Sequence, residues 1–232
     1  MKLLTNRVAF TTITNLMKKL NFLGNYKKVL VFAPHTDDAE LGCGATIARL
    51  INEGTAVFAA AFSVALPCEK NINAKNNTME EARAAAQSLG IERENLFFFD
   101  YEVRNFDKFR QNILDDMIRL RNEIKPDIVL LPSLGDFHQD HHVISREALR
   151  AFKHSSMLGY EEPWNNLETK TNLFVKVDDK HLQKKITAVE CYKSQTARSF
   201  VGAEKIKSLA VIRGLQANAE FAEAFEIIRL FL

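Results

Sequence analysis

From residue 28 onward, the chain alternates short, continuous apolar runs with longer segments whose apolar residues recur at helical spacing. Such runs are typical of strands that are buried on both faces of a parallel sheet. We expect strands over residues 29–33, 56–63, 95–99, 128–131 and 174–177. We expect helices over residues 41–51, 78–89, 108–124, 143–152, 181–191 and 218–232. This alternation predicts a three-layer α/β fold, in which a mainly parallel sheet carries helices on both faces.

The segments outside these elements are polar or irregular. Residues 67–77 are rich in asparagine and lysine and are expected to form a long loop, and residues 154–172 are expected to form a loop or a strand. Residues 8–23 place apolar side chains at helical spacing, with two lysines among them, so we interpret residues 1–25 as an amphipathic helical extension. Such a helix docks on the domain or on a second subunit of a homo-oligomer, or lies at a membrane surface. Residues 26–232 are expected to form a single domain, and no stretch approaches the ~20 apolar residues of a spanning helix.

Composition narrows the class of protein. The 31 basic and 29 acidic residues give a net charge of +2, which leaves no electrostatic footprint for nucleic acid. The three cysteines are far apart and lack CxxC spacing, so they are expected to be buried or free thiols in a reducing compartment. We therefore expect a cytoplasmic protein.

Acidic residues and histidines are concentrated in two short clusters. The first, residues 35–40, directly follows the apolar run 29–33, and the second, residues 136–142, comes shortly after the run 128–131. Each cluster follows a predicted strand, where parallel α/β sheets build their binding sites. Taken alone, the first cluster is explained by a capped turn and the second by a polar surface turn. Their occurrence together favours a metal site.

His35, Asp38 and His141 are the candidate metal ligands. His35 and Asp38 are three residues apart on one turn, and His141 supplies a third ligand if the two preceding strands are neighbours. Three nitrogen or oxygen ligands and an open position for water are typical of catalytic Zn²⁺, although Fe²⁺ or Co²⁺ would fit a similar geometry. Asp37 is then a spare carboxylate beside the ion and a candidate general base.

His138 and Asp140 complete the candidate catalytic residues. His138 is about one helical turn from His141 and could polarise a carbonyl group or donate a proton. Asp140 or Asp136 could hydrogen-bond its imidazole and fix its protonation. An activated water together with an acid and a base indicates hydrolysis of an amide or an ester.

The Gly42-Cys43-Gly44-Ala45 segment resembles a dinucleotide-binding loop only weakly, because Ile47 stands where the fingerprint requires glycine or alanine. We interpret its glycines as positions where a helix approaches the sheet closely. Of the remaining histidines, His142 is expected to lie outside the ligand set, and His154 and His181 are interpreted as ordinary histidines.

Taken together, the HxDD motif of residues 35–38 and the HxDH motif of residues 138–141 resemble those of the LmbE-like (PIG-L) family of zinc-dependent sugar de-N-acetylases. The residues that follow the first motif, up to Ala48, belong to the same resemblance. Weaker support comes from Ala86-Gln87-Ser88-Leu89-Gly90-Ile91, Ser194-Gln195 and Ala222-Glu223-Ala224-Phe225. The resemblance spans residues 28 to about 228.

The resemblance implies a Rossmann-like fold and removal of the acetyl group from an acetamido sugar of the N-acetylglucosamine type or from a carrier-linked sugar. By this similarity, the zinc ligands are matched by His35, Asp38 and His141, and the general base by Asp37. His138 matches the histidine that stabilises the tetrahedral oxyanion or protonates the leaving amine, and Asp140 matches the acid that orients it.

One departure from the family concerns the substrate. Many relatives carry a substrate-binding arginine at the start of the helix before the Ala-rich segment, and here residues 76–79 read Asn-Asn-Thr-Met. Arg198 or Arg213 is a candidate replacement. The leading hypothesis is a metal-dependent N-deacetylase. The alternatives are a carbohydrate- or nucleotide-binding protein without turnover and a metal hydrolase for a different acyl group.

Overall fold

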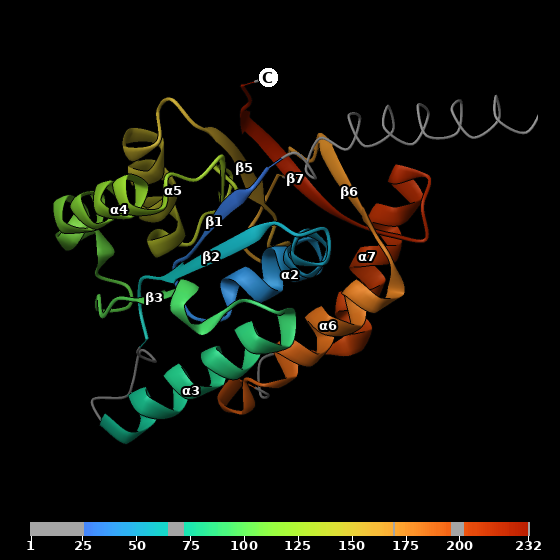
Figure 1. Ribbon diagram of the computed structural model, residues 1–232, viewed down its shortest axis with the longest axis horizontal. Helices are drawn as coiled ribbons and strands as arrows, with labels where there is room; N and C mark the ends of the chain where they lie inside the picture. The colour runs from blue at the N-terminus through green and yellow to red at the C-terminus, as the bar shows by residue number, and fades with distance from the viewer. Residues whose placement is uncertain (1–25, 65–71, 169, 196–201, 232) are drawn as a thin grey trace, which may run out of the picture.

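The computed structural model describes residues 26–64, 72–168, 170–195 and 202–231, and within them one seven-stranded sheet is covered by six α-helices (Figure 1). The strands are β1 (Lys28–Ala33), β2 (Ala56–Ala61), β3 (Leu96–Phe98), β4 (Ile128–Pro132), β5 (Ser156–Tyr160), β6 (Leu173–Val177) and β7 (Phe221–Arg229). The helices are α2 (Asp38–Asn52), α3 (Ile72–Leu89), α4 (Arg110–Ile124), α5 (Gln139–Ala151), α6 (Asp179–Glu190) and α7 (Ala203–Ala217). Three short 3₁₀ helices are η2 (Arg93–Asn95), η3 (Phe106–Phe109) and η4 (Lys193–Gln195).

The sheet has the strand order β3-β2-β1-β4-β5-β7-β6. The pairings among β3, β2, β1, β4 and β5 are all parallel, and β7 runs antiparallel to both β5 and β6. This arrangement confirms the predicted mainly parallel, Rossmann-like sheet. The chain moves outward from β1 to β3 and then crosses back to place β4 on the other side of β1. The carboxyl ends of β1 and β4 therefore meet where the strand order reverses, which is where open α/β sheets bind ligands.

Alternate residues of β1 face the two outer layers. Val29 and Val31 belong to the core that packs against α2, α3, α6 and α7, whereas Leu30 and Phe32 belong to the core beneath α4 and α5. All four side chains are fully buried, so both faces of the central strand are covered. Figure 1 shows these helices on opposite sides of the sheet, as the three-layer prediction required.

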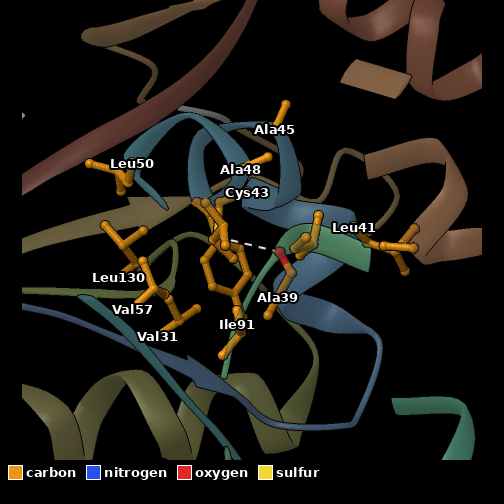
Figure 2. Packing of buried hydrophobic residues seen from close by; sticks show 14 of the residues in the cluster. Val31, Ala39, Leu41, Cys43, Ala45, Ala48, Leu50, Val57, Ile91 and Leu130 are labelled. Carbon is orange, nitrogen blue, oxygen red and sulfur yellow. Dashed lines mark hydrogen bonds between the residues drawn. The ribbon is translucent and has the colours of Figure 1, made fainter. Parts of the chain in front are cut away.

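Helix α2 is broken at Cys43, whose φ of −146° and ψ of 24° are not helical. The break frees backbone N–H groups in mid-helix, and the Glu223 carboxylate of β7 accepts hydrogen bonds from those of Ala45 (3.2 Å) and Thr46 (2.6 Å). Lys185 of α6 donates to the same carboxylate over 2.6 Å, and both side chains are buried. Glu223 thus caps the second half of α2. Figure 2 shows Cys43 within the surrounding apolar core, where its thiol donates to the Ala39 carbonyl.

The predicted helix over residues 218–232 is wrong, because this segment contains β7. Its alanines and glutamates favour a helix, but residues 221–226 are all buried between β5 and β6, so they show none of the alternation of a half-exposed strand. The helix of this region is α7, which the periodicity did not predict. Tertiary contacts override local propensity here.

One further boundary differs from the prediction, because helix α3 begins at Ile72, inside the segment expected to be a loop. Within residues 154–172, for which a loop or a strand was expected, the structure has the strand β5. The predicted N-terminal extension of residues 1–25, together with Cys68 and Arg198, lies outside the described residues. Of the helices that are described, none is both long and apolar enough to cross a membrane.

Candidate metal centre

The two acid and histidine clusters lie side by side at the carboxyl ends of β1 and β4. His35 comes two residues after β1, Asp37 is the N-cap residue of α2, and Asp38 is its first residue. His138 is the N-cap residue of α5, and His141 lies in its first turn. Because β1 pairs directly with β4, helices of opposite layers begin next to one another.

Three side-chain atoms face one another at this point. Nδ1 of His35 lies 3.3 Å from Oδ2 of Asp38 and 3.4 Å from Nε2 of His141. Nε2 of His141 lies 3.3 Å from the same oxygen of Asp38. Atoms that bind a tetrahedral zinc ion at about 2.0 to 2.1 Å are themselves about 3.3 to 3.4 Å apart. The three atoms therefore have the separations of one face of a zinc coordination tetrahedron.

Each of these histidines is held by a carboxylate at its other ring nitrogen. Asp140 Oδ2 lies 3.0 Å from Nε2 of His35, and Asp136 Oδ2 lies 2.7 Å from Nδ1 of His141. Asp38 is held by the backbone N–H of His35, which donates to its Oδ2 over 2.7 Å. A carboxylate behind a histidine fixes its orientation and raises its basicity as a metal ligand.

The electrostatics of the cluster favour positive charge. Burial alone would lower the pKa of His35, but Asp38 and Asp140 raise it to about 9. Burial likewise opposes charge on His141, yet Asp38 and Glu162 hold its pKa well above the ordinary value. Although burial opposes ionisation of Asp38, the two histidines keep the pKa of this carboxyl well below its usual range. The charge that the carboxylates favour can be a proton or a metal cation.

Glu162, two residues beyond β5, adds a further buried carboxylate that sequence reasoning missed. Its Oε2 lies 3.9 Å from Nδ1 of His141, and burial followed by repulsion from Asp38 raises its pKa well above the ordinary value. Its Oε1 and the Oδ1 of Asp140 are buried and have no hydrogen-bond partner among the described residues. A surplus of buried acceptor oxygens fits a site that holds a cation. The signal was a pair of acids after β5, and it was missed because a strand in this segment was only an alternative to a loop.

Two overlapping sets of residues have potential ligand atoms within 4.8 Å of one another: His35, His138 and His141, and also Asp38, His141 and Glu162. His141 belongs to both sets and is 1% exposed. The cluster therefore offers more donors than one tetrahedral ion needs, which leaves some of them available for substrate or for proton transfer.

His138 lies beside the other two histidines, with its ring centroid 5.0 Å from that of His35 and 4.6 Å from that of His141. Its Nδ1 accepts a hydrogen bond from the backbone N–H of Asp140 over 3.2 Å. Burial and the two neighbouring histidines lower the pKa of His138 to about 4. The ring is therefore neutral near pH 7, with its proton on Nε2.

The Asp140 carboxylate does not lie where the sequence predicted. It contacts His35 and the backbone N–H of Arg104 (2.7 Å), so the residue that it orients is His35 and not His138. Asp136, the alternative partner for the His138 imidazole, accepts from the His138 backbone N–H (2.8 Å) and holds the ring of His141. The reason is geometric. His138 is the N-cap residue of α5, so its ring contacts the backbone N–H of Asp140 and not a carboxylate.

Asp37, which precedes the candidate ligand Asp38, is 4% exposed and interacts with a second group of buried polar residues. In that group burial, followed by the Asp37 carboxylate, raises the pKa of Glu40 to about 8. Tyr192 closes it by donating from its hydroxyl to the Thr36 carbonyl over 2.5 Å. The structure thus keeps Asp37 beside the cluster.

The loop between β3 and η3 also contacts the second cluster. Besides donating to Asp140, Arg104 accepts a hydrogen bond at its carbonyl from Nε2 of Gln139 over 2.5 Å. Its φ of 67° lies in the left-handed region, which is strained for a residue other than glycine. No motif in this loop predicted the contact.

Arg213, one candidate for the missing substrate arginine, is committed elsewhere. Its guanidinium forms a bidentate ion pair with Glu161 at 2.7 and 2.6 Å. It borders an apolar cavity of about 240 Å³, whose lining includes Leu41 and Trp164 but none of the candidate ligands. Of the other histidines, His142 and His154 are exposed, and His181 takes part in a capping box at the start of α6.

Gly42 is required for the close approach of α2 to the sheet, as predicted. A Cβ atom at this position would lie 2.2 Å from the ring of Tyr160 at the end of β5. Tyr160 cannot retreat freely, because its hydroxyl donates to the Phe32 carbonyl of β1 over 2.9 Å. At Gly44 the nearest atom is Cγ of Lys185 at 3.0 Å, so that glycine makes room for α6 and not for the sheet.

Comparison with known proteins places this geometry in context. Residues 30–152 match the profile of the PIG-L family, described as GlcNAc-PI de-N-acetylase. A relative, the uncharacterized deacetylase YaiS of Escherichia coli (strain K12), is 29% identical over 174 residues, which cover 72% of this chain and 91% of that protein.

Solved structures share the fold. N,N'-diacetylchitobiose deacetylase from Pyrococcus horikoshii has a TM-score of 0.74 and 20% identity, covering 94% of this chain and 92% of its own. The zinc-inhibited form of teicoplanin deacetylase Orf2 has a TM-score of 0.72 and 17% identity, covering 85% of this chain and 96% of its own. At these identities the likeness shows the fold alone.

Proposed function

Because the chain belongs to the PIG-L (GlcNAc-PI de-N-acetylase) family, we propose that it is a zinc-dependent deacetylase that removes the acetyl group from an acetamido sugar. The relatives support this reaction class, since diacetylchitobiose deacetylase and teicoplanin deacetylase are among the proteins with this fold. Fe²⁺ or Co²⁺ suits the same mixed donor set and is the alternative to zinc.

One observation carries the proposal: the pairwise distances of 3.3, 3.3 and 3.4 Å among Nδ1 of His35, Oδ2 of Asp38 and Nε2 of His141. A purely structural cluster does not require two ring nitrogens and a carboxylate oxygen to point at one common position. Asp140 and Asp136 hold the opposite ring nitrogens and so keep the inner ones turned toward that centre.

The remaining residues supply the acid and the base. A zinc ion, when bound, is a Lewis acid that polarises a carbonyl and lowers the pKa of water to about 7. Asp37, adjacent to a ligand but outside the ligand set, takes the proton of the attacking water. His138 donates a hydrogen bond from Nε2 to the carbonyl oxygen as negative charge develops there, which its neutral state permits. The proton held by Asp37 then passes to the leaving amine, so that acetate and a free amino sugar result.

The test is release of acetate from N-acetylglucosamine, N,N'-diacetylchitobiose and phosphorylated acetamido sugars. Turnover should require metal, stop after chelation and return on addition of Zn²⁺, Fe²⁺ or Co²⁺, and metal analysis should give one ion per chain. Binding of a sugar by metal-loaded protein without any acetate would favour the non-catalytic alternative. Turnover that survives complete removal of the metal would contradict the proposal.

A further inference from the structure

A groove runs along the outer side of α5, between this helix and the segment formed by η3 and the start of α4. It has a volume of about 600 Å³, and its lining includes Arg110, His142, Arg146 and Arg150. On α5, the residues His138, His142, Arg146 and Arg150 follow one another at intervals of four, so they lie along one side of the helix. The lining of the groove on α5 begins with His142, one turn beyond His138, and the groove leads away from the candidate metal centre.

The arginines of this groove are positioned by one buried acid. Glu147 is fully buried and binds Arg110 at 2.7 Å through one oxygen and Arg150 at 2.5 Å through the other. Both arginine side chains nevertheless remain more than half exposed. One carboxylate thus fixes two guanidinium groups and leaves N–H donors of each facing solvent.

The charge of the groove is not balanced. Arg146 is exposed and makes no hydrogen bond or ion pair with any residue that the structure describes. Three arginines face two acids, Glu147 and Asp107, which leaves one positive charge. A multivalent anion would neutralise this surplus and use the donors that face solvent.

We propose that this groove binds the phosphate or diphosphate group of an anionic acetamido sugar, so that the acetyl group lies at the metal centre; this inference rests on the proposed function. Along α5, His142 lies about 6 Å and Arg146 about 12 Å beyond His138, at a rise of 1.5 Å per residue. A single phosphate on the sugar ring reaches only the first of these residues, whereas a diphosphate extends toward the second. A sugar 1-phosphate and a nucleoside-diphosphate or lipid-diphosphate sugar present the same chemistry to the groove.

The binding test uses inorganic phosphate and pyrophosphate, with calorimetric titration of the metal-loaded protein. We expect Arg146→Gln to weaken pyrophosphate binding about tenfold, the loss of one charge-assisted contact at a partly exposed site. Asp107→Asn should strengthen it, because it removes an opposing charge. The matched control is Arg93→Gln, an exposed arginine on η2 outside the groove. Pyrophosphate also binds zinc, so the measurement to interpret is the difference in affinity between the variants and the wild type. Equal affinities for the wild type and the three variants would overturn the proposal.

The kinetic test compares N-acetylglucosamine 1-phosphate and UDP-N-acetylglucosamine with neutral N-acetylglucosamine. The ratio of kcat/KM for the anionic sugar to that for the neutral sugar should fall about tenfold in Arg146→Gln, mainly through KM, and stay at the wild-type value in Arg93→Gln. We expect the larger fall with the nucleotide sugar, because a diphosphate extends toward Arg146 whereas a single phosphate reaches only His142. An unchanged ratio for both sugars would overturn the inference while leaving deacetylation intact. Absence of acetate from every sugar would instead contradict the proposed function.

Discussion

Two buried charged clusters flank the first half of α2, and they differ in how their charge is balanced. In the pair of Lys185 and Glu223, one cation meets one anion at 2.6 Å, and two backbone N–H groups occupy the carboxylate. In the metal cluster, carboxylates outnumber the histidines that can carry a proton, and two buried oxygens have no partner among the described residues. Lys185, Glu223, Asp38 and His141 are almost wholly removed from solvent, whereas the His35 side chain is 19% exposed.

This difference in charge balance distinguishes a buried ion pair that stabilises the fold from a buried cluster that serves the proposed reaction. Buried ions are costly unless they are paired, so a pair that is complete within the protein needs nothing else. An unbalanced cluster has room for an additional cation, and under the proposed function that cation is the metal that takes part in the reaction. Each of the following variants tests whether the two clusters respond as this distinction requires.

The largest effect is expected for Asp37→Asn in the metal cluster. Loss of a general base should lower kcat by about 10²- to 10⁴-fold, while the ion remains bound because its three ligands are intact. Acetate release and metal content, measured on the same sample, check this expectation. His141→Ala is the matched variant, which should lose the metal as well. Wild-type turnover in Asp37→Asn would remove the proposed base.

In the balanced pair, Lys185→Met should destabilise the fold by about 3 to 5 kcal/mol, because it leaves the buried Glu223 carboxylate without its cation. Urea unfolding measures this loss. The double variant Lys185→Met/Glu223→Gln should recover part of it, since the amide oxygen still accepts from the backbone N–H groups. If the pair is structural, the folded fraction of the single variant keeps its metal content, and loss of metal would contradict the distinction between the clusters.

Removal of the metal should lower the stability that the cluster of His35, Asp38 and His141 contributes and leave the Lys185–Glu223 pair unchanged. A bound ion stabilises the native state by about 2.7 kcal/mol when its free concentration is a hundred times its Kd. Chelation should therefore lower Tm, and added Zn²⁺ should restore it. Lys185→Met should show the same shift from its own lower Tm, because the two clusters are independent. A Tm that does not respond to chelator would show that the unbalanced cluster holds no stabilising ion.

The smallest effects concern the two glycines of α2. Gly42→Ala forces a methyl group against the Tyr160 ring and should cost about 1 to 3 kcal/mol, whereas Gly44→Ala meets only the flexible stem of Lys185 and should cost less. Thermal unfolding of both variants checks the order. A Gly44→Ala variant less stable than Gly42→Ala would show that the Lys185 side chain is held more tightly than its flexible stem implies.

The features that the sequence predicted well are those encoded by short segments. The HxDD motif follows β1 by two residues and the HxDH motif opens α5, so their side chains converge once β1 and β4 are neighbours. The residues that were missed depend on distant partners. Glu162 follows a strand whose short sequence shows no clear period, and the carboxylate of Asp140 takes His35 as its partner, 105 residues away.

The C-terminal strand illustrates the same limit. Glu223 lies in a segment whose composition favours a helix, and its role is to cap a break in another helix. The sequence around Cys43 does not predict the break in α2, and the sequence around Glu223 does not predict the cap. The two segments come together only in the folded protein. The weak Ala222-Glu223-Ala224-Phe225 resemblance was the one trace of this contact in the sequence.

The cap on α2 also has a consequence for biosynthesis. Thr46 is translated 177 residues before Glu223. The break in the helix that begins with Asp38 can therefore be capped only after those residues have been synthesised. Until then the helix has an uncapped break, and the lysine that will neutralise Glu223 has no counterion. A nascent or truncated chain that ends before β7 would therefore contain every candidate ligand while the break in α2 was still uncapped.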